Sequence, residues 1–84
     1  MKGDSKMNSA TVKIRLSTIK DVQNFVEVVR QFEGDIDLAS GRYVVDAKSI
    51  MGIFSLDLMS PITLTAYAES CDKLMEQIKD YIVD

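Results

Sequence analysis

Four segments of the chain have the pattern of strands. Three of them alternate apolar and polar side chains, and this period of two places every second side chain on the same face. The remaining segment returns as the partner of the second one, because turn residues, Ser40 and Gly41, separate the two. The four segments are residues 11–16, 35–39, 43–47 and 62–68. The side chains expected to face inward are Val12, Ile14, Leu16, Ile36, Leu38, Ile62, Leu64 and Ala66.

A helical period follows the first strand. Apolar residues from Ile19 to Phe32 recur every three or four positions and lie on one face of a helix. Thr18 and Asp21 have the spacing of a capping box, which marks the beginning of the helix. Gly34 lies just beyond the last apolar residue and marks its end.

Two further helices are expected in the second half of the chain. Ser49 precedes a short apolar segment, residues 50–54, which is long enough for one or two helical turns. Ser70 precedes the last helix, residues 71–82, whose apolar stripe begins at Cys71. Both serines are suitable N-caps, because a hydroxyl oxygen can accept a hydrogen bond from a free amide of the first turn.

The order of elements predicts the fold class. Amphipathic strands favour antiparallel pairing with one solvated face, and helices must then cover the other face. We therefore predict an α+β fold: an open-faced two-layer sandwich with a four-stranded antiparallel sheet and three helices on one face. The 84 residues suffice for one small domain. We assign residues 10–84 to this domain and the polar residues 1–9 to a disordered N-terminal tail.

Composition narrows the range of functions. With 13 acidic and 10 basic residues, a net charge of −3 and no tryptophan, the chain lacks the basic patch and the stacking aromatics of a nucleic-acid-binding protein. With no histidine and one cysteine, it lacks a metal-ligand set, and we expect no metal and no cofactor. We expect Cys71 to act as a small hydrophobic residue. The lack of a signal peptide or a spanning segment, together with the single cysteine, predicts a cytoplasmic protein.

One motif resembles that of a known family. Lys48-Ser49-Ile50-Met51-Gly52, followed by Ser55-Leu56, is similar to the regulatory-serine motif of the HPr family, the phosphocarriers of the bacterial sugar phosphotransferase system. Residues 30–38 resemble the passage from the first helix to the second strand in that family. The resemblance covers about residues 12–82, and it implies the same βαββαβα topology that the hydrophobic pattern predicts.

The chain departs from the family at the phosphorylation site. The resemblance implies that Thr18 stands where the family has its phosphorylated histidine, Lys20 at the arginine position and Asp21 at the proline position. A threonine hydroxyl forms a stable ester, whereas phosphorylated imidazole keeps a high transfer potential. The Asp21 carboxylate would also compete with a phosphoryl group for the positive end of the helix. We therefore interpret Thr18 as an N-cap, and the chain as a divergent member that is not an enzyme and cannot act as a histidine phosphocarrier.

Ser49 has two interpretations. As an N-cap it would only stabilise the short helix. The resemblance instead implies phosphorylation of this serine by a bifunctional kinase, after which the protein binds a LacI-type transcription regulator.

The short helix is apolar around most of its circumference, so it is either buried on all sides or binds a partner. We expect Ile53 to face inward. Lys48, Ile50, Met51 and Phe54 are the expected partner-binding residues. The resemblance implies protein partners: components of the phosphotransferase system, an HPr-type serine kinase or a transcription regulator.

A second class of function shares the order of elements. Small-molecule-binding regulatory domains of the ACT kind have βαββαβ topology, dimerise and bind amino acids at their interface. The apolar helix at residues 50–54 is not expected in that class.

Overall fold

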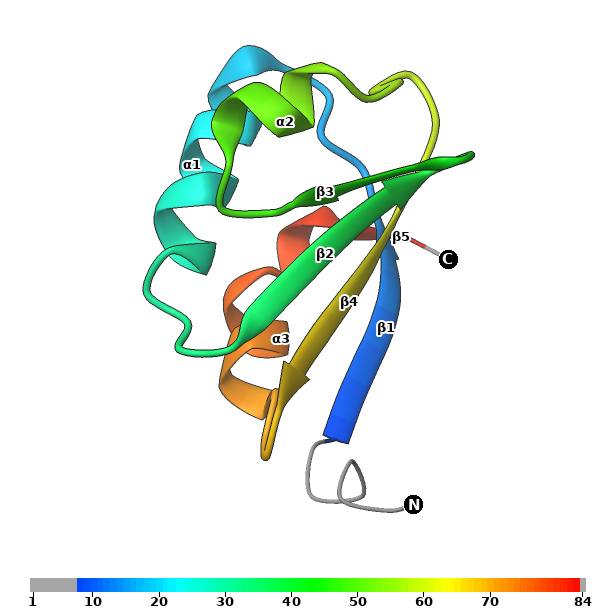
Figure 1. Cartoon of the computed structure of the whole chain (residues 1–84). Helices are drawn as coiled ribbons and strands as arrows, with labels where there is room; N and C mark the ends of the chain where they lie inside the picture. The colour runs from blue at the N-terminus through cyan, green and yellow to red at the C-terminus, as the bar shows by residue number, and fades with distance from the viewer. Residues whose placement is uncertain (1–7, 84) are drawn as a thin grey trace.

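A curved antiparallel sheet forms one layer of the fold, and helices cover one of its faces (Figure 1). The computed structural model describes residues 8–83. The strands are β1 (Asn8–Ile14), β2 (Asp35–Ser40), β3 (Tyr43–Asp46), β4 (Ile62–Ala68) and β5 (Ile82–Val83). The helices are α1 (Ile19–Val29), α2 (Ile50–Phe54) and α3 (Asp72–Gln77), and a 3-10 turn (Lys79–Tyr81) follows α3. The predicted α+β sandwich is confirmed.

The sheet contains one strand more than the sequence predicts. Its order is β3-β2-β4-β1-β5, with β2, β4 and β1 in the interior. The added strand, β5, is formed by Ile82 and Val83, which pair with Ile14 and Lys13 of β1. The predicted extent of the last helix, residues 71–82, is wrong, because Ile82 lies in β5. The helix ends at Gln77. The chain then returns to β1, because pairing at the sheet edge gives hydrogen-bond partners to backbone N–H and C=O groups.

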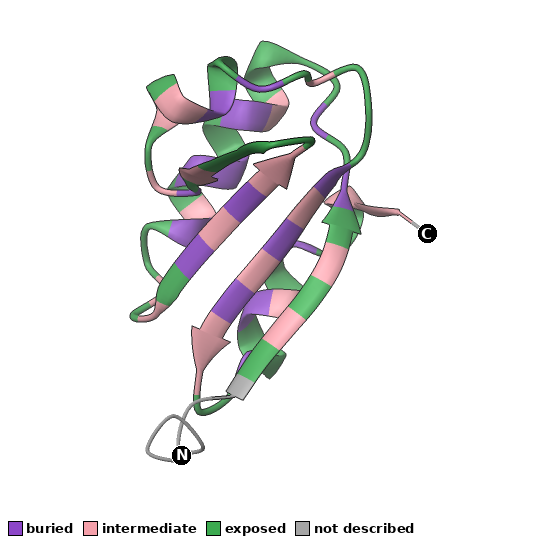
Figure 2. Cartoon of the chain, turned by 45° about the vertical axis from the view of Figure 1, so that its right-hand side comes forward, coloured by how far each residue is buried: buried purple, intermediate pink, exposed green. Residues whose placement is uncertain are grey.

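The alternation along the strands has the predicted consequence. Every second side chain of β2 and β4 is buried beneath the helices, as Figure 2 shows for the two central strands. The predicted inward residues with at most 1% exposure are Ile14, Leu16, Ile36, Leu38, Ile62, Leu64 and Ala66. Val12 is only partly buried, and the neighbouring strand β5 pairs only with Lys13 and Ile14, so it does not reach Val12.

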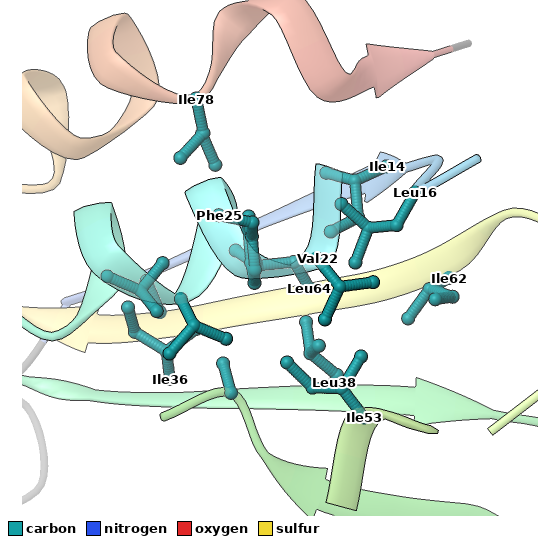
Figure 3. Packing of buried hydrophobic residues seen from close by; sticks show 14 of the residues in the cluster. Ile14, Leu16, Val22, Phe25, Ile36, Leu38, Ile53, Ile62, Leu64 and Ile78 are labelled. Atoms are coloured by element: carbon teal, nitrogen blue, oxygen red, sulfur yellow. The ribbon is translucent and has the colours of Figure 1, made fainter. Parts of the chain in front are cut away.

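Helix α1 supplies the middle of the core. Val22, Phe25, Val26 and Val29 are its buried residues. The Phe25 ring is fully buried and meets the Tyr81 ring edge to face, with centroids 5.9 Å apart. Figure 3 shows Phe25 beside Leu64 of the sheet, with Ile78 pointing toward it from the segment that follows α3.

Two ends of predicted elements differ in the structure. Ile19 was expected on the buried face of the first helix but is 67% exposed, because it lies in the first turn, beyond the core residue Val22. The first strand also begins earlier than the predicted residue 11, because β1 starts at Asn8, which pairs with Ala68. Residues 1–7 of the predicted tail lie outside the described residues.

The beginning of the last helix also differs from the prediction by one residue. Ser70 was expected as its N-cap, but the N-cap is Cys71, whose side chain makes no capping hydrogen bond. Ser70 Oγ accepts a long hydrogen bond from the Asp72 amide, at 3.5 Å.

Gly34 is required at the entry to β2 because another strand approaches it closely. A Cβ atom on this residue would lie 2.1 Å from the Tyr67 carbonyl oxygen and 2.7 Å from the Phe32 ring. We expect Gly34→Ala to lower the free energy of unfolding by about 1–3 kcal/mol, because the backbone of β4 must move to make room. Urea unfolding followed by circular dichroism measures this loss.

The neighbouring Glu33→Ala is the control for Gly34→Ala. Glu33 is exposed, so its truncation should change stability by less than about 0.5 kcal/mol. Equal stability of the two variants would contradict the close approach of β4 to Gly34.

Candidate functional site

Side chains at the N-terminus of α1 cap the helix. Thr18 Oγ1 accepts a hydrogen bond from the Asp21 amide at 3.0 Å, and Asp21 Oδ2 accepts one from the Thr18 amide at 3.3 Å. This is the predicted capping box. Asp21 Oδ2 also accepts from the Ser17 amide at 3.1 Å. The carboxylate thus lies against the backbone N–H groups at this end of the helix, where an incoming phosphoryl group would meet a like charge.

The other residues of this terminus lie at the surface. Lys20 is exposed, and no hydrogen bond or ion pair of its side chain is found within residues 8–83. Ile19 beside it is the exposed apolar residue of the same turn. Thr18, Lys20 and Asp21 therefore come together at one helix end, and none of their side chains is an imidazole.

Ser49 begins the second part of the site. It is the N-cap of α2, and its Oγ accepts a hydrogen bond from the Gly52 amide at 3.2 Å. Its side chain is exposed. The Ser55 hydroxyl donates to the Gly52 carbonyl at 2.6 Å and closes the other end of the helix. The cap interpretation of Ser49 is confirmed.

Helix α2 divides its apolar side chains between the core and the surface. Ile53 is completely buried, as predicted. Met51 is 77% exposed and Phe54 is 41% exposed, while Ile50 is partly buried against the core. We call Ile50, Met51 and Phe54 the α2 surface. Helix α2 packs against α1, and Figure 1 shows it beside the N-terminal half of that helix.

Lys48 is engaged within the chain. Its ammonium group donates a hydrogen bond to the Phe32 carbonyl at 2.7 Å, in a partly buried position. Phe32 follows the C-terminus of α1, where a cation is favourable because of the helix dipole. The structure thus brings Ser49 together with the α2 surface but directs the Lys48 charge away from both. The contact of Lys48 with a partner stays a prediction.

A cavity of about 390 Å³, which no pattern in the sequence indicates, lies beside the N-terminus of α1. Arg15, Ser17, Asp21, Asp80, Tyr81 and Val83 line it. Burial, and then the charges of Asp21 and Asp80, raise the pKa of the Tyr81 hydroxyl above its ordinary value of 10.0. The hydroxyl therefore stays protonated and neutral at physiological pH. No local signal relates Arg15 to Tyr81, because they meet only when the end of the chain folds back on β1.

Residues 8–83 contain neither a metal-ligand group nor a membrane-spanning helix. No group of three or more His, Cys, Asp or Glu side chains in this range is placed to hold a metal ion. No helix in this part of the chain has the length and apolar character needed to cross a membrane. Cys71 is buried, and its thiol lies 3.7 Å from the Ala66 carbonyl.

Comparison with known proteins identifies the family. The model of the family described as "PTS HPr component phosphorylation site" matches residues 9–84. The chain belongs to the HPr family. HPr proteins are phosphocarriers that interact with other proteins of the phosphotransferase system, and they are not enzymes. This membership decides against the ACT alternative.

Solved HPr structures have the same fold. The phosphocarrier protein HPr from Bacillus anthracis str. Ames is 28% identical, with a TM-score of 0.69 over 92% of this chain and 98% of that chain. HPr-C-His from Thermoanaerobacter tengcongensis is 23% identical, with a TM-score of 0.67 over 87% of this chain and 88% of that chain. The search of curated proteins found no match. Against this family background, the sequence of the present chain contains no histidine.

Proposed function

We propose that this HPr-family protein does not carry phosphoryl groups on histidine and acts by binding protein partners through the α2 surface. The observation that carries the proposal is the exposure of Met51 and Phe54 on a helix whose Ile53 is fully buried. Two large apolar side chains of this helix are exposed to water. Covering them with a partner lowers the free energy, because apolar surface is removed from water. Methionine suits such a contact, because its flexible side chain adapts to different partner surfaces.

The loss of phosphocarriage rests on the N-terminus of α1. The chain has no imidazole, and the hydroxyl of Thr18 is used as a helix cap. Asp21 adds a negative charge at the backbone amides of Ser17 and Thr18. Both features oppose a labile phosphoryl group at this position.

The partners we propose are proteins of the phosphotransferase system, an HPr-type serine kinase or a transcription regulator, encountered in the cytoplasm. We expect Met51→Asp to weaken binding to such a partner by about tenfold or more, because a buried charge without a partner costs at least ~1.4 kcal/mol. Calorimetric titration of enzyme I and of an HPr-type serine kinase, each with the purified variant, measures the loss.

Met59→Asp is the matched control. Met59 is 85% exposed in the loop between α2 and β4 and lies outside the α2 surface. This variant should bind as the unaltered protein does. Equal affinities of the Met51→Asp variant and the unaltered protein for every partner that binds would contradict the assignment of the α2 surface.

We further propose that Ser49 is phosphorylated. Its support is the family's motif around an exposed serine at the edge of the α2 surface. A phosphate would add about −1.5 to −2 charge next to Met51 and Phe54, and would thereby alter which partners bind. Incubation with an HPr-type serine kinase and ATP should add one phosphate, which mass spectrometry of peptides locates.

Two serine variants make the assignment specific. Ser49→Ala should abolish the modification, whereas Ser55→Ala, at the other end of the same helix, should retain it. If the protein stays unmodified after prolonged incubation, the proposed phosphorylation of Ser49 is wrong. The Met51→Asp titration would still test binding through the α2 surface.

A further inference from the structure

Strand β3 is an edge strand with unusual exposure. It pairs with β2 on one side only, and its register with β2 runs without a bulge from Asp46 to Tyr43. Tyr43 is 71% exposed and Val44 is 63% exposed. An edge of this kind is a template for a further strand, and proteins commonly protect it with a bulge, a proline or an inward charge. β3 has no bulge, proline or inward charge, and its protection is limited to its short length of four residues.

The hairpin geometry determines which backbone groups of β3 are free. Gly41, with φ of 61°, and Arg42 form a two-residue loop, so the flanking pair Ser40–Tyr43 is hydrogen bonded. Hydrogen-bonded and non-bonded pairs alternate along an antiparallel ladder, and Val44 is therefore a non-bonded position. Its N–H and C=O groups point away from β2, toward the free edge.

The charges at the two ends of β3 are complementary. Arg42 immediately precedes the strand, and Asp46 ends it. Within residues 8–83 the Arg42 side chain has no hydrogen bond or ion pair. Asp46 Oδ1 accepts from the Lys48 amide at 2.8 Å, and Asp46 stands directly opposite Asp37 in the sheet. Two carboxylates that face each other across a ladder destabilise it, and a cation brought to this position would relieve the repulsion.

We propose that β3 is the contact between two copies of this chain, paired antiparallel about a twofold axis at Val44. In this register Val44 faces Val44 of the second copy, and the two exchange the backbone hydrogen bonds that point outward. Arg42 of each copy then lies opposite Asp46 of the other. Tyr43 of each lies opposite Val45 of the other, a pairing of aromatic and β-branched side chains that favours sheets.

The segment from Arg42 to Asp46 is thus complementary to itself when it is reversed, as a twofold contact requires. The opposite edge of the sheet lacks this property. There β5 covers only Lys13 and Ile14 of β1, and the uncovered residues, Asn8 to Val12, carry no charge that could set a register. The twofold axis is perpendicular to the sheet, so the α2 surfaces of both copies lie on the same side of one continuous sheet.

Sedimentation velocity of the full chain tests the dimer. Because the contact is small, we expect monomer at about 10 μM and a substantial dimer fraction at about 1 mM. Arg42→Glu places a second acidic group opposite each Asp46, and Asp46→Arg places a second cation opposite each Arg42. Each variant alone should raise the dissociation constant by about tenfold or more.

A mixture of the Arg42→Glu and Asp46→Arg variants gives the most specific test of the proposed charge pairs. In the mixed dimer the glutamate introduced at position 42 of one copy faces the arginine introduced at position 46 of the other. The unaltered Asp46 and Arg42 face each other at the second contact, so both charge pairs are restored. Native mass spectrometry should then show the mixed dimer in excess over either homodimer.

Val44→Lys is an independent variant, because it places two lysines face to face at the axis. Val44→Lys still tests the contact if Asp46→Arg disturbs the turn toward α2. Circular dichroism of the Asp46→Arg variant detects such a disturbance. Val44→Lys should also raise the dissociation constant by about tenfold or more.

Three results would overturn the proposal. The first is a wild-type chain that stays monomeric at about 1 mM. The second is a dimer that persists unchanged in Arg42→Glu and Val44→Lys, which would place the contact on another surface. The third is a mixture of folded charge variants with no preference for the mixed dimer.

Discussion

Replacement of Phe25 by alanine is expected to lower the free energy of unfolding by about 3–5 kcal/mol. Phe25 is 0% exposed, lies between α1 and the sheet, and contacts the Tyr81 ring edge to face. Truncation leaves a cavity that the surrounding β-branched and leucine side chains cannot fill without moving the backbone. Urea unfolding followed by circular dichroism gives the value. For a domain of this length the loss is a large part of the total stability.

Phe54→Ala is the matched control, because the same substitution then removes a ring that is 41% exposed. Its expected cost is about 1–2 kcal/mol, smaller than that of Phe25→Ala, since part of the Phe54 ring is already in contact with water. Equal losses at the two positions would contradict the division of the two rings between the core and the α2 surface. The control variant would also be expected to bind partners more weakly.

The second large effect concerns the missing phosphocarrier chemistry. The unaltered chain should accept no acid-labile phosphate from enzyme I and phosphoenolpyruvate, whereas the double variant Thr18→His, Asp21→Ala should accept it. Thr18→His supplies the imidazole nucleophile, and Asp21→Ala removes the carboxylate from the Ser17 and Thr18 amides. Radiolabelled phosphoenolpyruvate and an acid-stability assay measure the difference.

The control for this experiment is Thr18→Gln, Asp21→Ala, which makes equivalent changes to the helix terminus but adds no nucleophile. Both double variants lose the capping box, so each should lose about 1–2 kcal/mol of stability, and circular dichroism must show that they fold. Acid-labile phosphate on the unaltered chain would refute the proposed loss of phosphocarriage. A folded histidine variant that accepts none would contradict the assignment of Thr18 as the position of the lost nucleophile.

Features encoded within a few neighbouring residues could be predicted from the sequence. The burial of alternate residues in β2 and β4 follows from a period of two that needs no knowledge of the partner strand. The capping box of Thr18 and Asp21 and the N-cap at Ser49 follow from spacings of three residues. The inward orientation of Ile53 is also predicted and confirmed, but it depends on which side of the short helix meets the core and therefore on the tertiary structure.

The candidate site could be predicted only in part. Its two segments, at Thr18 and at Ser49, were found from local motifs, and the absence of histidine is itself a property of the sequence. The engagement of the Lys48 ammonium by the Phe32 carbonyl joins residues 16 positions apart. The cavity between Arg15 and Tyr81 forms only because the end of the chain returns to β1, and no local pattern predicts this return.

The sequence alone determined the class of fold, the faces of its strands, the capped ends of two helices and the lack of an imidazole nucleophile. These properties depend on side-chain type and on the short-range periods of helix and strand. Only the tertiary structure decided that Ile19 is left in water, that the last residues form β5, that the Lys48 charge is directed inward and that the edge of β3 is free. Each of these depends on what lies opposite a residue in space, and distant parts of the chain supply that neighbour.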